Sequence, residues 1–528
     1  MGRKAVGLLG RWLAAVCWLA AGLGNAAAEE FRTPSITAVR VEWRAVLDQL
    51  RTEIATSPAI ASRFTFAGQR RVPAWDPRST PALVQLNAVN ASLFTGIGRS
   101  PVPVLLPFDS AVYLEDQADG IWLPLSRYQA DFGPADLFHA GLSGYDAVFS
   151  LQPGAGGSRI FAKPVEVQIT GSILVYDLAD PLGGRGEPVK ALAAQFLDMR
   201  RFIREGYVRY AFTRFGVPYV VSIQCLDSAP RARRLACREA YPIAERFLKA
   251  LRIAGGQPAR PRYDIPSEVA HRPAAASPDF TYYPGGDIIA RSSVRRRGGR
   301  ADYAAYSQIR FPLERAPTAI RSQSFGGKNS EAGRGVYPWR DNFCEARSFQ
   351  VGQCAAGFGH QGQDVRPAPC PPNSNSESSC HPRKRAVVAV RDGILIRSPR
   401  QQAATLQINT RNEHIRFRYM HMNPSAMDAD GILNGRRVAE GEKIGVVSNY
   451  LDFPNGTSYH LHFDVQVFTR DGWVWVNPYT TLIASYERLI RGRGREIGTD
   501  PPAVAAVVHA LPEDVLRHSV RQGQGREN

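Results

Sequence analysis

The stretch SYHLHFDVQV (residues 458–467) sets two histidines on one face of a predicted strand. Apolar residues at every odd position from 459 to 465 alternate with His460, His462 and Asp464. This alternation is typical of a β-strand that buries one face. Because successive side chains point to opposite faces, His460 and His462 share the other face and can reach one common centre. A pair of surface histidines on a half-exposed strand would give the same pattern.

A segment upstream carries further groups suited to a metal site. In GFGHQGQDV (357–365), His360 and Asp364 are four positions apart, and the glycines between and before them permit a tight, irregular backbone. Zinc favours imidazole and carboxylate ligands, and a catalytic zinc site uses three protein ligands plus water. His360, Asp364 and one histidine of the 460/462 pair would form such a set.

These motifs belong to a predicted C-terminal domain over residues 304–485. Short strand-like runs between glycines and polar turns predict a mainly antiparallel β fold there. One of them, RFRYMHM (416–422), is a strand candidate with His421 on its polar alternation. Four of the ten histidines therefore lie in three short motifs of one domain. Neither His381 nor His414 has a matching context.

The whole chain is predicted to be of mixed class, with an N-terminal α+β domain before the β domain. The N-terminal domain covers residues 29–256 and is followed by a Pro/Arg-rich linker at 257–303. A tail of residues 486–528 closes the chain. A length of 528 residues is too great for one ordinary core, which agrees with two folded domains.

Within the N-terminal domain, the sequence predicts helices and a hairpin but no catalytic site. Apolar residues at helical spacing predict helices over 41–57, 187–205 and 240–256, the last ended by two glycines. Residues 207–227 are strand-like, with a turn at Gly216-Val217-Pro218. The lone histidine, His139, has no partner motif. The domain could inhibit the cleft, bind the cell wall, hold a partner or act as a folded spacer.

The first 28 residues predict a cleavable signal peptide. Positive charge in MGRK and at Arg11 precedes a short apolar run at 12–23, and three alanines precede Glu29. A retained anchor helix is the alternative, although the run is short for a bilayer span. No other stretch approaches about 18 continuous apolar residues. The sequence thus predicts a periplasmic or secreted protein with no integral membrane span after removal of the signal.

Cysteine usage and charge agree with export. Six cysteines follow the signal segment, and an even number in an exported chain predicts disulfides. They form three neighbouring pairs, Cys225 with Cys237, Cys344 with Cys354, and Cys370 with Cys380. The formal charge is +17, and loss of Arg3, Lys4 and Arg11 with the signal leaves +14. A basic exported protein is expected to meet anionic envelope polymers rather than nucleic acid.

The order of these motifs resembles the lysostaphin-type (LytM-like) zinc metalloendopeptidase family of bacterial cell walls. The resemblance covers residues 305–480. Its elements are HxGxD at 360–364, a strand ending in Y-x-H at 419–421, a Gly-rich turn, and HLHF at 460–463. The connecting segments are also similar. SQSFGG (322–327) resembles the family's opening turn, and AVVAVRDGILI (386–396) resembles its strand-DG-strand hairpin. NGRRVAEGEKIGVVSN (434–449) resembles the segment before its final strand.

The resemblance implies a fold, a metal and a set of roles. The fold would be the family's duplicated hybrid motif of small β-sheets. One Zn²⁺ per chain would be held by His360, Asp364 and His462. His460 and His421 would orient and deprotonate the water or stabilise the tetrahedral intermediate.

The activity that the resemblance implies is hydrolysis of amide bonds in peptidoglycan stem or cross-bridge peptides. Two loops, 334–357 and 365–385, are longer than is typical of the family, and such loops shape the substrate groove. Some relatives have lost their ligands and activate wall amidases without catalysis, and some disulfide-bearing relatives cleave proteins. The family's ligand and catalytic positions are all occupied here, which favours an enzyme over a non-catalytic activator.

Overall fold

The computed structural model describes residues 34–55, 60, 63–64, 81–152, 161, 163–178, 186–204, 206–225, 234–258, 279–285, 308–321, 337–345, 347–354, 357–367, 385–451 and 453–497. The predicted signal peptide, most of the linker and most of the tail lie outside these residues. So do Cys370, Cys380 and SQSFGG (322–327).

The N-terminal part contains a seven-stranded antiparallel sheet in the order β3-β4-β5-β10-β9-β8-β7. Its elements are β1 (Ile36–Ala38), α2 (Trp43–Ile54), α4 (Pro81–Asn90), β2 (Val104–Leu106), α5 (Ser110–Ala118), β3 (Phe132–Ala140), β4 (Gly144–Leu151), β5 (Glu166–Ser172), β6 (Leu174–Tyr176), β7 (Glu187–Pro188), β8 (Arg200–Arg204), β9 (Tyr207–Arg214), β10 (Val217–Gln224), α6 (Ala240–Lys249) and β11 (Arg252–Gly255).

The C-terminal part contains an eight-stranded sheet in the order β13-β14-β21-β18-β17-β16-β19, with β22 also paired to β21. Its elements are β12 (Phe280–Tyr282), β13 (Thr318–Ile320), β14 (Gln363–Pro367), β15 (Ala386–Val388), β16 (Gly393–Ile396), β17 (Ala404–Asn409), β18 (His414–Met420), α9 (Pro424–Ala429), β19 (Arg437–Val438), β20 (Lys443–Val446), β21 (Leu461–Thr469), β22 (Gly472–Val476), α10 (Tyr479–Ile490) and β23 (Gly494–Glu496). A mixed, β-rich fold class is therefore confirmed.

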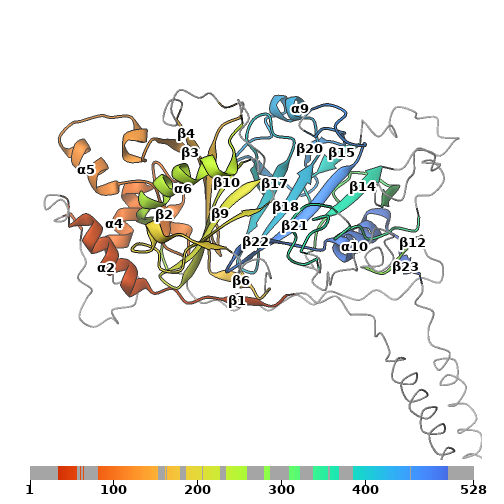
Figure 1. Ribbon diagram of the computed structural model, residues 1–528, viewed down its shortest axis with the longest axis horizontal. Helices are drawn as coiled ribbons and strands as arrows, with labels where there is room; N and C mark the ends of the chain where they lie inside the picture. Colours follow the sequence, from red (N-terminus) through yellow and green to blue (C-terminus); the bar gives the residue numbers. More distant parts are fainter. Residues whose placement is uncertain are drawn as a thin grey trace, which may run out of the picture.

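The two sheets pack face to face, with α2, α4 and α6 on the outer side of the N-terminal sheet and α10 on the outer side of the C-terminal sheet (Figure 1). The odd-numbered residues of β4, β5 and β10 and the even-numbered residues of β9 point into one outer core, where they pack against α2, α4 and α6. Phe417, Phe463 and Val465 of the second sheet pack in the other outer core with α10. Each sheet thus buries an apolar face outward and turns its more polar face toward the other sheet.

The layer between the sheets is largely polar. Asp146 on β4 accepts from His414 Nε2 at 3.0 Å and from Arg416 at 3.2 Å, both on β18. Arg209 on β9 donates to the Trp473 carbonyl oxygen at 2.7 Å. Small apolar clusters flank these bonds, one around Trp473 and Phe468 and another around Ile394 and Ile396.

The Asp146 carboxylate is the electrostatic centre of this layer. Burial would raise its pKa, but the charges and hydrogen bonds of His414 and Arg416 outweigh burial and hold the pKa well below its usual range. A buried charge of this kind is tolerated because it is paired, by Thr170 of its own sheet and by His414 and Arg416 of the opposite sheet. The bond network therefore fixes how the two sheets face each other.

Several local predictions are confirmed. A helix forms at Trp43–Ile54, and its buried residues Val46, Leu50 and Ile54 lie on one face. The 207–227 segment forms a hairpin, although its turn is at Phe215-Gly216, where both residues have positive φ. Such φ values are those of a tight hairpin turn that matches the strand twist.

Other local predictions are wrong. Residues 187–205 are not a helix: they form two short strands and a 3₁₀ turn, because β8 pairs with β9 and tertiary pairing overrides helical spacing. The helix predicted over 240–256 ends at Lys249, and β11 then pairs with β2. AVVAVRDGILI (386–396) is not a hairpin, since β15 pairs with β20 whereas β16 pairs with β17 and β19.

Two disulfides join the predicted neighbours, Cys225 with Cys237 and Cys344 with Cys354. Disulfides persist mainly outside the cytoplasm, so these agree with an extracytoplasmic protein. Within the described residues, none of the helices has the length and apolar character needed to cross a bilayer.

Candidate active site

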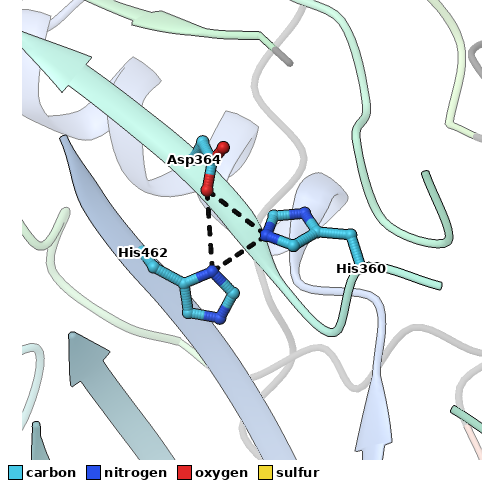
Figure 2. Close-up of side chains that lie close together, drawn as sticks. All are labelled: His360, Asp364 and His462. Atoms are coloured by element: carbon cyan, nitrogen blue, oxygen red, sulfur yellow. Dashed lines mark hydrogen bonds and ion pairs between the residues drawn. The ribbon is translucent and has the colours of Figure 1, made fainter. Parts of the chain in front are cut away.

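Three candidate ligands converge where β14 and β21 run side by side. Asp364 on β14 is paired in register with His462 on β21, and His360 lies in the turn that leads into β14. His360 Nε2 is 2.9 Å from His462 Nδ1 and 3.3 Å from Asp364 Oδ1 (Figure 2). His462 Nδ1 is 3.6 Å from Asp364 Oδ1. All three side chains are buried.

Two glycines of the HxGxD region make this approach possible. A Cβ on Gly362 would lie 2.4 Å from the carbonyl oxygen of Phe463, and one on Gly359 would lie 2.7 Å from the Cα of Cys344. Both distances are far inside van der Waals contact. The missing side chain at Gly362 therefore lets the backbone approach β21, and the missing side chain at Gly359 lets it approach the Cys344–Cys354 disulfide.

Hydrogen bonds on the outer ring nitrogens fix how the two ligand histidines present themselves. His360 Nδ1 donates to the Asn342 carbonyl oxygen at 3.0 Å, and His462 Nε2 donates to Asp464 Oδ2 at 3.2 Å. A histidine binds a metal as a neutral imidazole, which carries one proton, so in that state His360 Nε2 and His462 Nδ1 keep their lone pairs. Two lone pairs 2.9 Å apart repel unless a cation or proton lies between them.

The donor set fits a zinc ion on distance and charge. Zinc–ligand bonds of about 2.0–2.1 Å in a tetrahedron place ligand atoms about 3.3 Å apart, close to the separations of 2.9, 3.3 and 3.6 Å. Burial would raise the pKa of Asp364, but His460 and His360 hold that pKa well below its usual range. Arg366 contacts the other carboxylate oxygen, Oδ2, at 3.5 Å, which leaves Oδ1 for the centre.

A second pair of histidines, His421 and His460, borders the same centre. Their ring centroids are 4.6 Å apart, and His460 Nε2 is 3.3 Å from Asp364 Oδ1. His460 Nδ1 donates to the Ser458 carbonyl oxygen at 2.7 Å. Its Nε2 therefore carries the lone pair and points toward the candidate metal position.

His421 reaches the cleft by leaving the strand rather than by alternation along it. Strand β18 ends at Met420, and its cleft-facing residues are Arg416 and Arg418, so the expected polar alternation of His421 is wrong. A φ of +70° at His421 turns its ring to the side of the even-numbered residues. A left-handed backbone is uncommon for a residue other than glycine, and such strain gathers at functional sites.

The tautomer of His421 follows from its partners. Its Nδ1 lies 3.1 Å from Gln402 Oε1 and 2.9 Å from the Tyr450 carbonyl oxygen, both of which are acceptors. The Gln402 oxygen also accepts from the His421 backbone N–H, which identifies it as the amide oxygen. Burial, with smaller contributions from His460 and His462, lowers the pKa of His421 to about 3. His421 is thus a neutral imidazole with an unprotonated Nε2.

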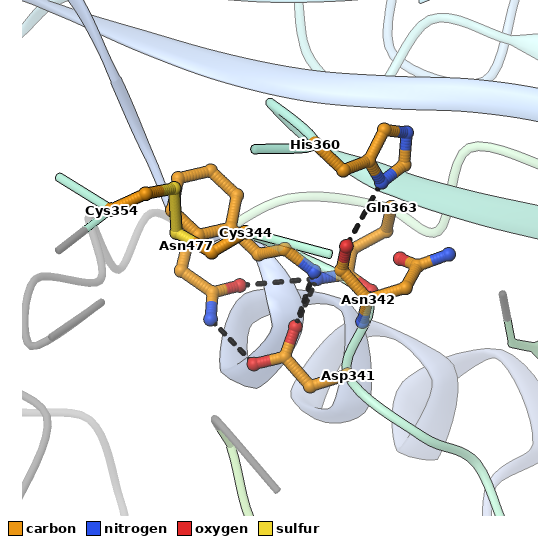
Figure 3. The surroundings of a disulfide bond; sticks show 8 residues. Asp341, Asn342, Cys344, Cys354, His360, Gln363 and Asn477 are labelled. Carbon is orange, nitrogen blue, oxygen red and sulfur yellow. Dashed lines mark hydrogen bonds between the residues drawn. A yellow bond between two sulfur atoms is a disulfide. The ribbon is translucent and has the colours of Figure 1, made fainter. Parts of the chain in front are cut away.

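The disulfide-bearing loop holds His360 from behind. The Cys344 N–H donates to the His360 carbonyl oxygen, and the His360 N–H donates to the Glu345 carbonyl oxygen, both at 2.8 Å. Gln363, the first residue of β14, donates to both Asp341 and Asn477 (Figure 3). The described part of the enlarged 334–357 segment therefore positions a candidate ligand, in addition to bordering the cleft.

Two clusters, each of one Asp, one Arg and one His, lie beside the candidate metal position. One joins β18 to β21, and the other joins β18 to β4. Asp464 accepts from His462, from Arg418 Nε at 2.7 Å and from Trp475 Nε1 at 3.2 Å. Burial would raise the pKa of Asp464, but Arg418 and His462 keep that pKa below its usual value. Asp146, Arg416 and His414 repeat the arrangement one pair of residues further along β18.

The candidate site lies in a cleft of about 690 Å³ between the two sheets. The second sheet and its loops supply the five site residues His360, Asp364, His421, His460 and His462. The N-terminal sheet lines the same cleft from β5, β9 and β10. The sequence did not predict this wall, and it did not single out Asp464, Gln402, Asn342 or Arg366.

Comparison with known proteins adds little. No protein-family profile matches the chain, and no curated protein matches it. A solved structure from Ruminococcus gnavus, provisionally named glycyl-glycine endopeptidase lytM, shares 18% identity over 26% of this chain and 50% of that one, with a TM-score of 0.18. A likeness this slight assigns neither a family nor a function.

Proposed function

We propose that this protein is a zinc-dependent endopeptidase that hydrolyses amide bonds in peptidoglycan stem or cross-bridge peptides. The zinc ligands would be His360, Asp364 and His462, and the catalytic residues would be His460 and His421. The observation that carries the proposal is the convergence of three buried ligand atoms, each oriented by a partner on its far side.

The residues of the chain divide the chemistry between them. A bound zinc ion would supply a Lewis acid for the scissile carbonyl and would lower the pKa of a water molecule. His460 and His421 each present an unprotonated Nε2 beside the ligand group. A neutral imidazole in this position can take a proton from the attacking water and return it to the leaving amine.

The partners of the two catalytic histidines support these roles. Ser458 fixes His460 through its carbonyl oxygen, and Tyr450 and Gln402 fix His421. The rings are held before substrate arrives, so little reorganisation is needed during the reaction. Arg366 anchors Asp364 by its Oδ2 and so limits rotation of that carboxylate.

The choice of peptidoglycan as substrate rests on the motif resemblance and on the setting of the protein. Disulfides point to a compartment outside the cytoplasm. The chain is also basic, with a formal charge of +17, and cell-wall polymers are acidic. Both observations favour a wall substrate over a cytoplasmic one.

Two alanine variants test the ligand and catalytic assignments. His462→Ala is expected to lose bound zinc and activity together, whereas His460→Ala is expected to keep zinc and lose turnover. Metal content is measured by elemental analysis, and the products of purified wall digestion are identified by mass spectrometry, which also shows the bond cleaved. Stoichiometric zinc in His462→Ala would refute the ligand set, and intact walls with zinc-loaded wild type would refute the activity.

A further inference from the structure

We propose that the N-terminal sheet is the second wall of the substrate site and that Gln168, Tyr207 and Gln224 bind the main chain of an extended peptide. The inference rests on the proposed peptidase function and extends it to a part of the chain with no motif. It assigns the N-terminal domain a direct role in substrate recognition, rather than that of a spacer.

The three residues lie on one face of the N-terminal sheet. Gln168 on β5 is paired across the sheet with Ser222 on β10, and Gln224 on β10 is paired with Tyr207 on β9. Because cross-strand partners point to the same side, these side chains form two adjacent rows. All of them line the cleft that also contains the candidate ligands.

The wall reaches the immediate surroundings of a candidate catalytic residue. Gln224 Oε1 accepts from Gln401 Nε2 at 2.6 Å, and the next residue, Gln402, holds the His421 ring at 3.1 Å. A peptide whose scissile bond lies beside His421 therefore passes close to the end of β10. The two sheets form one continuous cleft at this point.

The docking of the two sheets makes this wall a fixed one. Buried hydrogen bonds from His414 and Arg416 to Asp146, and from Arg209 to the Trp473 carbonyl oxygen, hold the two sheets together beside the cleft. Removing one member of such a buried pair leaves the other charge without a partner, which makes separation of the faces unfavourable. The wall is preformed and needs no closure on the substrate.

The side-chain types match a polypeptide main chain. Each peptide unit offers one N–H donor and one C=O acceptor, and a glutamine amide offers both complements. Gln168 and Tyr207 are half-buried and Gln224 is exposed, so their polar ends can meet a ligand. Phe349 and Leu451 on the opposite wall are 42% and 39% exposed and provide apolar surface for substrate side chains.

The test uses the full-length zinc-loaded protein with Gln168→Met and Tyr207→Phe, which remove hydrogen-bonding atoms and keep size. Two probes of equal length are compared, a synthetic peptidoglycan stem peptide and an unstructured peptide of protein sequence. Each variant should raise KM about fivefold, the effect of one lost neutral hydrogen bond, with kcat changed less than about twofold. Gln152→Met, just past β4 and outside the cleft, is the matched control and should leave both constants unchanged.

The outcomes separate this inference from the proposed function. A KM rise with the stem peptide supports both, and a rise only with the protein peptide supports the wall but refutes a peptidoglycan substrate. If wild type cleaves neither peptide, the proposed function fails, and calorimetric binding of the two peptides decides the inference. The inference is overturned if KM is unchanged in the variants, or if peptide binding is absent or is equal in wild type and variants. Gln224→Met at the strand end provides a second variant if Gln168→Met fails to fold.

Discussion

Replacing Asp464 by Asn should weaken zinc binding, whereas replacing Asp146 by Asn should not. Both aspartates are buried, and each accepts from one arginine of β18 and one histidine. Of the two, Asp464 orients a candidate ligand, because its partner His462 turns the opposite ring nitrogen toward the candidate metal position. The two variants therefore share a structural cost and differ in their effect on the metal.

The magnitudes follow from these contacts. Loss of an outer partner of a metal-bound histidine lowers metal affinity about 10–100-fold, or about 1.4–2.7 kcal/mol. Removing the charge from either buried cluster should also lower the free energy of unfolding of the metal-free protein by about 3–5 kcal/mol. Asp146→Asn should show this loss of stability with an unchanged zinc dissociation constant.

The two quantities are measured separately. Competition with a chromogenic chelator gives the zinc dissociation constant, and urea unfolding in excess chelator gives the stability of the metal-free protein. Wild-type zinc affinity in Asp464→Asn would refute the assigned orientation of His462. Equal weakening of zinc binding in both variants would show that the effect is transmitted through general stability instead.

Three further predictions address the surroundings of the site. Gln402→Met should lower kcat about 10-fold or more with normal zinc content, because His421 loses one of its two oriented acceptors, and Gln402→Glu should restore much of it; equal kcat in both would refute the role. Burial raises the pKa of Glu166 to about 7, so the folded state binds a proton that the unfolded state has already lost, and the free energy of unfolding should fall by about 3 kcal/mol as pH rises from 4.5 to 7. Glu166→Gln should flatten this pH dependence in thermal unfolding curves, and an unchanged dependence on pH would contradict the prediction. Replacing Cys344 and Cys354 by Ser should cost about 2–4 kcal/mol in unfolding free energy and weaken zinc binding measured by chelator competition, because this loop bonds the His360 backbone on both sides; unchanged zinc affinity would show that the loop does not position the ligand.

The candidate ligands were accessible from sequence because local patterns fix most of their geometry. Period-two alternation put His462 on a polar strand face, and the glycines around His360 indicated a tight approach. Asp464 shared the same alternation and could have been singled out by its spacing of two from His462. No local signal marked Asn342 or Gln402, since their roles depend on loops that meet only in the folded chain.

The predictions that failed depended on backbone torsion or long-range pairing. His421 lies out of phase with Arg416 and Arg418, and only its left-handed backbone brings the ring into the cleft. The helix predicted at 187–205 was replaced by strand pairing with β9, which supplies Tyr207 to the cleft. Packing of one sheet on the other cannot be read from either sequence segment alone, so the N-terminal wall was not anticipated.

The polar layer between the two sheets also limits how this protein can be shortened or recombined. Cutting the chain after residue 258 would strip Asp146 from His414 and Arg416 and uncover Trp473 and Phe468. The separated C-terminal half would carry the Arg416 charge without its counter-charge and an exposed apolar surface, and these conditions promote aggregation. Fusing the C-terminal half to an unrelated binding domain would therefore fail unless the fusion also contained a replacement for β4, β9 and β10.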